Sequence, residues 1–421
     1  MSVSGTVDQQ RVIVVSSDCH AGPPAIADYA PFVPTRYNEV FDEYVRAVDA
    51  YDAEAAAVAA RQGGGLQHGG AATRVDEGLW DVGTRTRHLT ADGVVGEILF
   101  PQGGVPFAPY PAVGGGPIGK MRWSCPAEVR NAGPEIYNRW LAELCAADPD
   151  MHYGVAVLPI RDVEAAVAEV VRARDSGLYG GVSLPPVADD FPMYNDPVYE
   201  PLWAACQDTG MTINLHGGAG RFYGRGPDAS ALTLAETDFF SKRTLWFLIF
   251  SGVFERYPRL HVAVTEQRAH WVPAVLAELD SIYQWPRSAR LREQLPKLPS
   301  EYFATNCYVG ASFFSRPECQ MRSRTGVDRI MWGSDYPHME GSWPWVNEAL
   351  RWTFEGVDET ELRMMLGGNA IACYGFDADR LQERAAEIGP TVEEITASPT
   401  TVPPDATGAE YSWAWRTGVW H

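Results

Sequence analysis

The stretch Val12-Ile13-Val14-Val15-Ser16-Ser17-Asp18-Cys19-His20 opens with an uninterrupted apolar run and ends with two side chains of types that bind metal ions. Continuous apolar runs are typical of strands that are buried on both faces, as in a parallel sheet. Asp18 and His20 lie two positions apart, so an extended chain would point both to the same side. The stretch therefore predicts a buried parallel strand, with metal-binding groups just past its carboxyl end.

Seven further apolar, β-branched runs follow along the chain. Together the eight lie near residues 11–17, 94–100, 153–159, 179–185, 211–216, 260–266, 306–311 and 328–334. Helical patterns separate them, and Pro197–Gly210 opens with proline and closes with glycine, the usual asymmetry of a helix. Eight strands alternating with helices predict an α/β fold, the (β/α)8 TIM barrel. The alternative, an open doubly wound sheet, is disfavoured because no Gly-x-Gly-x-x-Gly turn follows the first run.

Three connections exceed ordinary loop length. Residues 21–92, 101–133 and 217–240 follow the first, second and fifth predicted strands. Loops after strand carboxyl ends surround the mouth of a barrel, so we expect these insertions to fold over it. The alternative is that they are packing elements without a function.

The chain changes character near its end. We assign residues 11–376 to the barrel and residues 377–421 to a C-terminal extension, whose last part is rich in aromatic side chains. These are Tyr411, Trp413, Trp415 and Trp420. So aromatic a tail is expected to dock on the body or on a second subunit, and we expect a homo-oligomer, a dimer.

Composition limits the partners. The formal net charge is −20, so the chain repels nucleic acid and anionic membrane surfaces, and neither is expected as a partner. The seven cysteines are scattered without a Cys-x-x-Cys pair, which is typical of reduced thiols. Met1–Gln10 is short and polar, and no segment has the length and apolarity of a membrane span. We expect a cytoplasmic protein that acts on a small molecule.

Other strand ends carry further metal-binding residue types. His216 ends Thr212-Ile213-Asn214-Leu215-His216, Glu266 ends Val262-Ala263-Val264-Thr265-Glu266, and Asp335 follows the eighth run. A parallel barrel gathers its strand ends at one mouth, so residues far apart in sequence can meet around one ion. An acid at the end of a buried strand is costly unless it is paired or coordinated. Each residue alone could be an ordinary satisfied polar group, but Asp18, His20, His216 and Asp335 together form a plausible two-nitrogen, two-carboxylate site.

These motifs carry a resemblance to a known family. The Asp-x-His pair, Asn214-Leu215-His216-Gly217-Gly218, Ser251-Gly252-Val253-Phe254-Glu255-Arg256-Tyr257-Pro258 and Gly333-Ser334-Asp335-Tyr336-Pro337 stand in the order that this family shows. Over residues 11–376 the chain resembles the amidohydrolase-related family of the amidohydrolase superfamily. That branch also contains aminocarboxymuconate-semialdehyde decarboxylase and the nonoxidative aromatic-acid decarboxylases.

The resemblance implies a distorted barrel with one divalent metal ion. It places the metal ligands at Asp18, His20, His216 and Asp335, with zinc as the expected ion and manganese or iron as alternatives. It also makes Asp335 the carboxylate that handles a proton. The chain departs from the family pattern in having Asp-x-His for His-x-His, so Asp18 either binds the ion directly or only orients a ligand. It also has Glu266 where several relatives carry histidine, which argues against the aromatic-decarboxylase mechanism at that position. Only three lysines are present and none ends a predicted strand, so a mononuclear site is expected.

Several further side chains are candidates for the reaction or for the substrate. Glu266 and His270 could assist Asp335 if both face the mouth, although His270 could equally be a polar contact at a helix start. His338, three residues after Asp335, is a candidate substrate contact. Arginines on loops after strand ends could bind a carboxylate through two hydrogen bonds, although most arginines are simply solvated. The arginines selected are Arg85, Arg221 and Arg268.

Three functions are compatible with these residues. The first is a hydrolase, in which a bound cation lowers the pKa of its water from about 15.7 towards about 7 and Asp335 takes the proton. The alternative is a nonoxidative decarboxylase of a small aromatic or unsaturated carboxylic acid, in which the metal binds substrate oxygens. A catalytically inactive barrel that acts as a binding protein would be expected to lack a ligand, and none of the four is missing.

Overall fold

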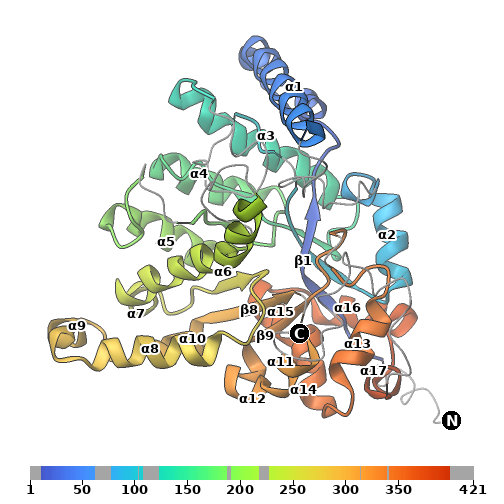
Figure 1. Ribbon diagram of the computed structural model, residues 1–421, viewed down its shortest axis with the longest axis vertical. Coiled ribbons are helices and arrows are strands. Elements are labelled where there is room, and N and C mark those ends of the chain that lie inside the picture. Colours follow the sequence, from blue (N-terminus) through green and yellow to red (C-terminus); the bar gives the residue numbers. More distant parts are fainter. Residues whose placement is uncertain are drawn as a thin grey trace.

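The computed structural model describes residues 11–61, 77–102, 104–107, 123–186, 191–217, 227–312, 314–338 and 341–398. Parallel strands occupy the centre and helices surround them (Figure 1). The strands are β1 (Val15–Ala21), β2 (Gly96–Pro101), β3 (His152–Gly154), β4 (Ala156–Val157), β5 (Val182–Ser183), β6 (Ile213–His216), β7 (Val262–Thr265), β8 (Cys307–Ser312) and β9 (Ile330–Gly333). All paired strands are parallel, as the continuous apolar runs predict.

The strands close into a barrel through two junctions. Backbone bonds define one sheet in the order β1-β2-β3 and another in the order β4-β5-β6-β7-β8-β9. At Val155 the chain changes sheets, because the amide of Val155 donates to Leu99 and that of Ala156 donates to Gly181, each at 2.9 Å. At the other junction the amide of Asp335 donates to the carbonyl of Asp18 at 2.9 Å. Since β3 and β4 together occupy the predicted third run, the eight-stranded barrel is confirmed.

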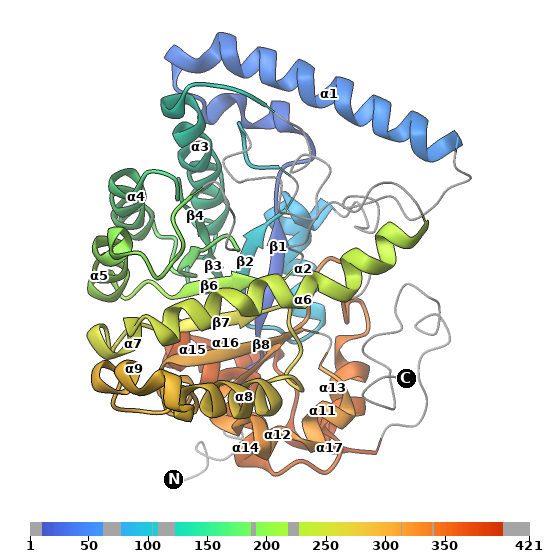
Figure 2. The same ribbon diagram turned by 60° about the vertical axis from the view of Figure 1, so that its left-hand side comes forward.

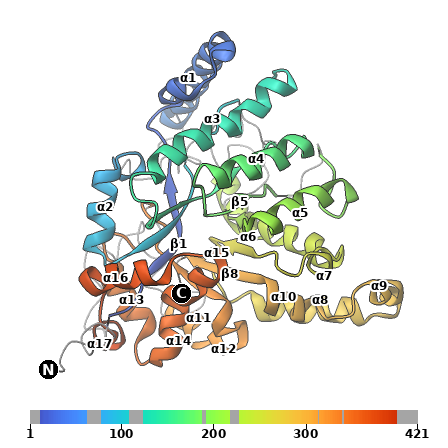
Figure 3. The same cartoon turned by 180° about the vertical axis from the view of Figure 1, so that it is seen from behind.

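Helices follow the strands around the outside. Figure 3 shows α3, α4 and α5 succeeding one another along one flank. The helices are α1 (Asn38–Arg61), α2 (Val82–Ala91), α3 (Ala127–Cys145), α4 (Val163–Asp175), α5 (Glu200–Thr209), α6 (Pro227–Phe250), α7 (Val253–Arg256), α8 (Val272–Gln284), α9 (Ala289–Gln294), α10 (Pro299–Asn306), α11 (Arg316–Gln320), α12 (Arg322–Thr325), α13 (Val346–Phe354), α14 (Glu359–Arg363), α15 (Asn369–Tyr374), α16 (Ala378–Ile388) and α17 (Val392–Thr396). Local signals set several ends: the Asp162 carboxylate caps α4 by accepting from the Ala165 amide, and Gly210 ends α5 with a φ of 68°.

Two cores separate the inside of the barrel from its outside. The smaller core gathers inward-facing residues of several strands with side chains of α15 and α16; its strand members include Val15, Ile98, Tyr153, Ala263, Tyr308 and Met331. The larger core lies between the strands and the surrounding helices, and it contains Cys19 and Leu99. Because strand side chains alternate between faces, this division shows which residues of β1 and β2 point inward.

The insertions are partly described. The first one contains α1, which lies across one end of the molecule (Figure 2), and α2, which packs beside β1 and β2. The first half of α1 packs on the body, because Phe41, Tyr44 and Val48 are buried. Residues 62–76, 103, 108–122 and 218–226 of these insertions lie outside the described residues.

The C-terminal extension begins as part of the folded body. Leu381, Ala385 and Ile395 are buried, and the amide of Val12 donates to Pro390 at 2.8 Å. The aromatic residues from Tyr411 onwards lie outside the described residues, so their docking stays a prediction. Among the helices of the described chain, none combines the length and apolarity that crossing a bilayer requires.

The first strand begins and ends later than predicted. It spans Val15–Ala21 instead of residues 11–17, so Asp18 and His20 lie on the strand and not beyond it. The strand continues because its polar end pairs with two neighbours: Cys19 and His20 pair with β2, and the amide of His20 donates to Tyr336 at 2.8 Å.

Candidate metal centre

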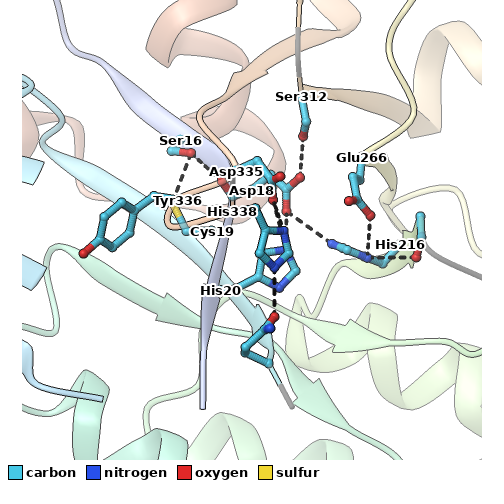
Figure 4. A network of polar contacts seen from close by, with 12 residues as sticks. Ser16, Asp18, Cys19, His20, His216, Glu266, Ser312, Asp335, Tyr336 and His338 are labelled. Atoms are coloured by element: carbon cyan, nitrogen blue, oxygen red, sulfur yellow. Dashed lines mark hydrogen bonds and ion pairs between the residues drawn. The ribbon is translucent and has the colours of Figure 1, made fainter. Parts of the chain in front are cut away.

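Side chains from the ends of three strands, β1, β6 and β9, meet at the carboxyl end of the barrel (Figure 4). Asp18, His20 and His216 each offer a ligand atom within 4.8 Å of the others, and so do His20, Asp335 and His338. His20 is common to both groups. The four predicted ligands are thus brought together from β1, β6 and the segment after β9, as the strand-end argument predicts.

A register shift in β1 turns both of its ligands towards the inside of the barrel. The pairing of β1 with β2 is irregular between Ser16 and Cys19. Val15 belongs to the inner core, whereas Cys19 belongs to the outer one. Between Val15 and Cys19, β1 therefore contains one residue more than regular alternation allows. Cys19 points outward, and Asp18 and His20 on either side of it point inward.

The ring of His20 presents a lone pair to two carboxylates. Its Nδ1 lies 3.5 Å from the carbonyl oxygen of Pro101, which can only accept, so the ring proton belongs on Nδ1. Its Nε2 lies 3.1 Å from Oδ1 of Asp335 and 3.6 Å from Oδ1 of Asp18. Burial lowers the pKa of His20 well below its ordinary value, and His338 adds to this effect. The Nε2 atom of a neutral imidazole carries a lone pair, so together with the two carboxylates that it faces it can bind a cation.

Both ring nitrogens of His216 also face acceptors. Its Nδ1 lies 3.1 Å from the carbonyl of Gly217 and 3.3 Å from Oε2 of Glu266, and both are acceptors. Its Nε2 faces Oδ1 of Asp18 at 3.2 Å. Burial alone lowers the pKa of His216, but the carboxylates of Glu266 and Asp18 outweigh burial and raise it to about 9. The surroundings of this ring favour positive charge.

Asp335 is the third observation that points to a cation. It is fully buried, and neither carboxylate oxygen accepts a hydrogen bond from the described part of the chain. A buried carboxylate without such partners is strongly destabilised unless a cation compensates it. Its φ of 56° is unusual for a residue other than glycine, and such backbone strain concentrates at functional sites. The donor set of two imidazoles and two carboxylates therefore fits a divalent ion.

His338 adjoins the four predicted ligands. Its Nδ1 lies 2.9 Å from Oδ1 of Asp335, and its ring stacks on that of His20 with centroids 3.9 Å apart. Its Nε2 is 2.9 Å from Oε1 of Gln102. The structure thus places His338 against the centre itself.

Glu266 contacts His216 and stands directly beside the glycine that follows it. A Cβ atom on Gly217 would lie 2.6 Å from Oε2 of Glu266 and 2.8 Å from its carbonyl oxygen. Glu266 has a φ of 56°, which turns its side chain out of the regular alternation of β7. A carboxylate on the second nitrogen of a metal-binding imidazole fixes the orientation of the ring.

The sequence reasoning missed the partners of Asp18. The hydroxyl of Ser312 donates a short hydrogen bond to Oδ2 of Asp18. The hydroxyl of Ser16 lies 2.7 Å from the carbonyl oxygen of Asp18 and 3.0 Å from the hydroxyl of Ser334. Ser312 had a signal, because it is the polar residue that follows the seventh apolar run.

Of the remaining candidates, His270 has a described partner outside the cluster of predicted ligands. Nδ1 of His270 is 3.2 Å from Oε1 of Glu318, which also accepts from the Ala269 amide at 2.9 Å. The structure therefore pairs His270 with Glu318 and not with Asp335. Arg268 is partly buried with a φ of 51°. Arg221 lies outside the described residues.

Arg85 is not a substrate contact. Its side chain is fully buried against Glu97, at 2.6 Å, and it is not available at the mouth. The prediction from sequence was wrong because α2 packs along the outside of the strands, where Glu97 of β2 supplies a buried partner.

Comparisons with known proteins agree with this geometry. A family model described as Amidohydrolase matches residues 119–376. A gamma-resorcylate decarboxylase of Rhodococcus jostii (strain RHA1) is 28% identical over 264 residues, covering 58% of this chain and 76% of that protein. A 2-amino-3-carboxymuconate-6-semialdehyde decarboxylase of Dictyostelium discoideum is 21% identical over 308 residues, covering 73% and 80%.

Solved structures share the fold. A dihydroxybenzoic acid decarboxylase from a Polaromonas species, with bound manganese and the inhibitor 2-nitroresorcinol, aligns with a TM-score of 0.58 at 18% identity, covering 88% of this chain and 99% of that one. The relatives described above are decarboxylases. The first expectation, a hydrolase, is therefore not supported, and the alternative of a decarboxylase is.

Proposed function

The chain belongs to the amidohydrolase family and is an enzyme, and from this premise we propose that it removes CO2 from a small aromatic or unsaturated carboxylic acid in a metal-dependent, nonoxidative reaction. The observation that carries the proposal is the meeting of two imidazole rings with two buried carboxylates. We assign Asp18, His20, His216 and Asp335 as the ligands of one divalent cation.

The reaction needs one proton and no oxidant. A proton bonds to the carbon that carries the carboxylate, the bond to the carboxylate breaks, its electron pair returns to the ring and CO2 leaves. A divalent cation supplies a Lewis acid that draws electron density from the substrate's oxygen atoms. Asp335 is the group we assign to deliver the proton, because it is buried and its oxygens accept no hydrogen bond from described residues.

The substrate class follows from the ligands and their surroundings. We propose an aromatic acid with a hydroxyl group beside the carboxylate, which offers two neighbouring oxygens to one cation. Phe100 supports this choice, since its ring lies 4.3 Å from that of His216 and forms an apolar side of the centre. The names of the relatives, gamma-resorcylate decarboxylase and dihydroxybenzoic acid decarboxylase, point to the same class.

The identity of the metal is a separate proposal. Zinc was expected from the resemblance, but two carboxylates and two imidazoles suit manganese equally well, and a structural neighbour holds manganese. We propose manganese or zinc. The free thiols of all seven cysteines support a reducing compartment, the cytoplasm.

Isotope incorporation tests the reaction. The protein, loaded with Mn²⁺ or Zn²⁺, is incubated with 2,6-dihydroxybenzoate and 5-carboxyvanillate in D2O. We expect CO2 release and one deuteron at the vacated ring position. A hydrolase would release no CO2 from these acids and would instead cleave an ester or amide of them. His216→Ala should abolish turnover, whereas His261→Ala, at the opposite end of β7, should retain it.

A further inference from the structure

Arg85 on α2 is a charged side chain in a fully buried position. Its Nε and Nη2 donate to the two carboxylate oxygens of Glu97 at 2.6 Å each. Its Nη1 donates to the carbonyl oxygens of His20 and Gly78, at 2.8 Å each. The guanidinium therefore connects three parts of the chain. These are β2, the turn that precedes α2, and β1, which carries the proposed ligands Asp18 and His20.

Glu97 has a second buried partner besides Arg85. Nδ1 of His152 on β3 lies 2.7 Å from Oε1 of Glu97, and the side chains of both residues are fully buried. Burial raises the pKa of Glu97, but Arg85 and His152 outweigh burial and hold it at about 2. Glu97 therefore stays a carboxylate at neutral pH, and Arg85 has a fixed anchor.

This ion pair lies on the outer side of the barrel wall. Ile98 and Phe100 belong to the inner core, so Glu97 points outward by alternation along β2. Arg85 thus binds the backbone of His20 from outside the barrel, while the ring of His20 faces the metal centre inside. This hydrogen bond holds the main chain at a proposed ligand, and Arg85 does not enter the space that a cation would occupy.

Arg85 also reaches the second side of the junction that closes the barrel. Its Cζ lies 5.0 Å from the ring centroid of Tyr336, the residue after Asp335. Figure 4 shows the ring of Tyr336 directed away from the ligand cluster. The hydroxyl of Tyr336 lies 2.8 Å from Nδ1 of His88, also on α2, and its carbonyl accepts from the His20 amide at 2.8 Å.

We propose that Arg85 is a positioning residue of the metal centre, which sets the separation of His20 and Asp335 by holding the backbone of one and the neighbour of the other. This inference rests on the proposed metal site. It makes α2 part of the centre's support, and it gives the first insertion a role other than covering the mouth.

Arginine is suited to this role and lysine is not. The planar guanidinium offers a fork of donors that can bind a carboxylate through two bonds while its third nitrogen reaches two carbonyls. A lysine at position 85 keeps the charge and one contact with Glu97, but a single ammonium cannot occupy all these positions. Arg85→Lys therefore separates positioning from charge.

The experiment compares metal affinity with fold stability in the full-length protein. Arg85→Lys is set beside Asn138→Ala, which removes a different buried polar network, in which Asn138 binds Glu169 at 2.6 Å and the backbone of Val157. For each protein, chelator competition gives the Kd for Mn²⁺, thermal unfolding of the metal-free form gives Tm, and the visible spectrum of the Co²⁺ form reports ligand geometry.

We expect Arg85→Lys to weaken Mn²⁺ binding about tenfold or more and to shift the Co²⁺ spectrum. Asn138→Ala should lower Tm while its Kd stays within about twofold of wild type, because it touches no proposed ligand. Equal Kd values for Arg85→Lys and Asn138→Ala, with an unchanged Co²⁺ spectrum, would overturn the inference. If Arg85→Lys does not fold, Glu97→Gln provides the same comparison, since it loosens the anchor of Arg85. Failure of the wild type to bind Mn²⁺, Zn²⁺ or Co²⁺ would instead overturn the proposed function.

Discussion

Oε2 of Glu266 lies 3.3 Å from Nδ1 of His216, on the opposite side of the ring from the nitrogen that faces Asp18. Sequence reasoning assigned Glu266 to catalysis, as an assistant to Asp335. The contact with His216 favours a different role, in which Glu266 keeps the ring proton on Nδ1 and turns Nε2 towards the cation. The variant Glu266→Gln distinguishes these roles.

Glu266→Gln should weaken metal binding by roughly 10- to 100-fold, the usual effect of removing a carboxylate behind a metal-binding histidine. The physical reason is that a neutral amide makes the Nε2 lone pair a weaker ligand. Chelator competition measures this change, with Glu278→Gln on the exposed face of α8 as the control. An unchanged Kd with a large loss of turnover at saturating metal would return Glu266 to the catalytic role.

Asp335→Asn should lower kcat by about 10²- to 10⁴-fold, because the proposed proton donor is replaced by an amide of the same shape. Deuterium incorporation at the vacated carbon, followed by NMR, measures the proton-delivery step directly. Asp328→Asn, exposed and paired with its neighbour Arg329, serves as the control. Turnover within about twofold of wild type in the metal-loaded Asp335→Asn protein would remove Asp335 from the reaction.

Asp92 predicts a pH dependence of stability away from the site. Burial raises the pKa of this carboxyl to about 7, and Glu348 adds to the effect. Below the ordinary pKa of 3.8 both folded and unfolded chains hold the proton; between there and about 7 only the folded chain holds it. The stabilisation from the protonated folded form is therefore fully present below pH 3.8 and is lost as the pH rises to about 7.

Asp92→Asn should remove that loss. We expect a higher free energy of unfolding than wild type at pH 8, by at most about 4 kcal/mol, and little difference near pH 4. Urea unfolding at both pH values measures it, beside the exposed Asp150→Asn as the control. A gain of equal size at both pH values would show that charge on Asp92 is not the cause.

The sequence was sufficient to predict the barrel because its signals are local. Continuous apolar runs identified every strand, and the strand ends identified Asp18, His20, His216 and Asp335, because parallel strands gather those ends at one mouth. His338 was predicted as a candidate only from its position three residues after Asp335. Such residues are found without knowing which helix packs where.

The support behind the ligands could not be predicted in this way. The pairing of Arg85 with Glu97 depends on how α2 packs against β2, and nothing local to Arg85 separates it from a solvated arginine. Glu97 did carry a signal, since a carboxylate in the middle of the buried run 94–100 requires a partner. The turn of Glu266 towards His216 depends on the positive φ of Glu266, which the residue types around it do not predict.

Gly217→Ala tests whether that turn controls the centre. The added Cβ would lie 2.6 Å from Oε2 and 2.8 Å from the backbone oxygen of Glu266, distances that real Cβ atoms essentially never show. The flexible carboxylate can move more easily than the backbone, so we expect Glu266 to withdraw from His216. Metal affinity should then fall as it does in Glu266→Gln. Because both changes act through the same contact, the double variant should bind metal about as weakly as either single variant, whereas multiplied losses would mean that Gly217 acts by another route.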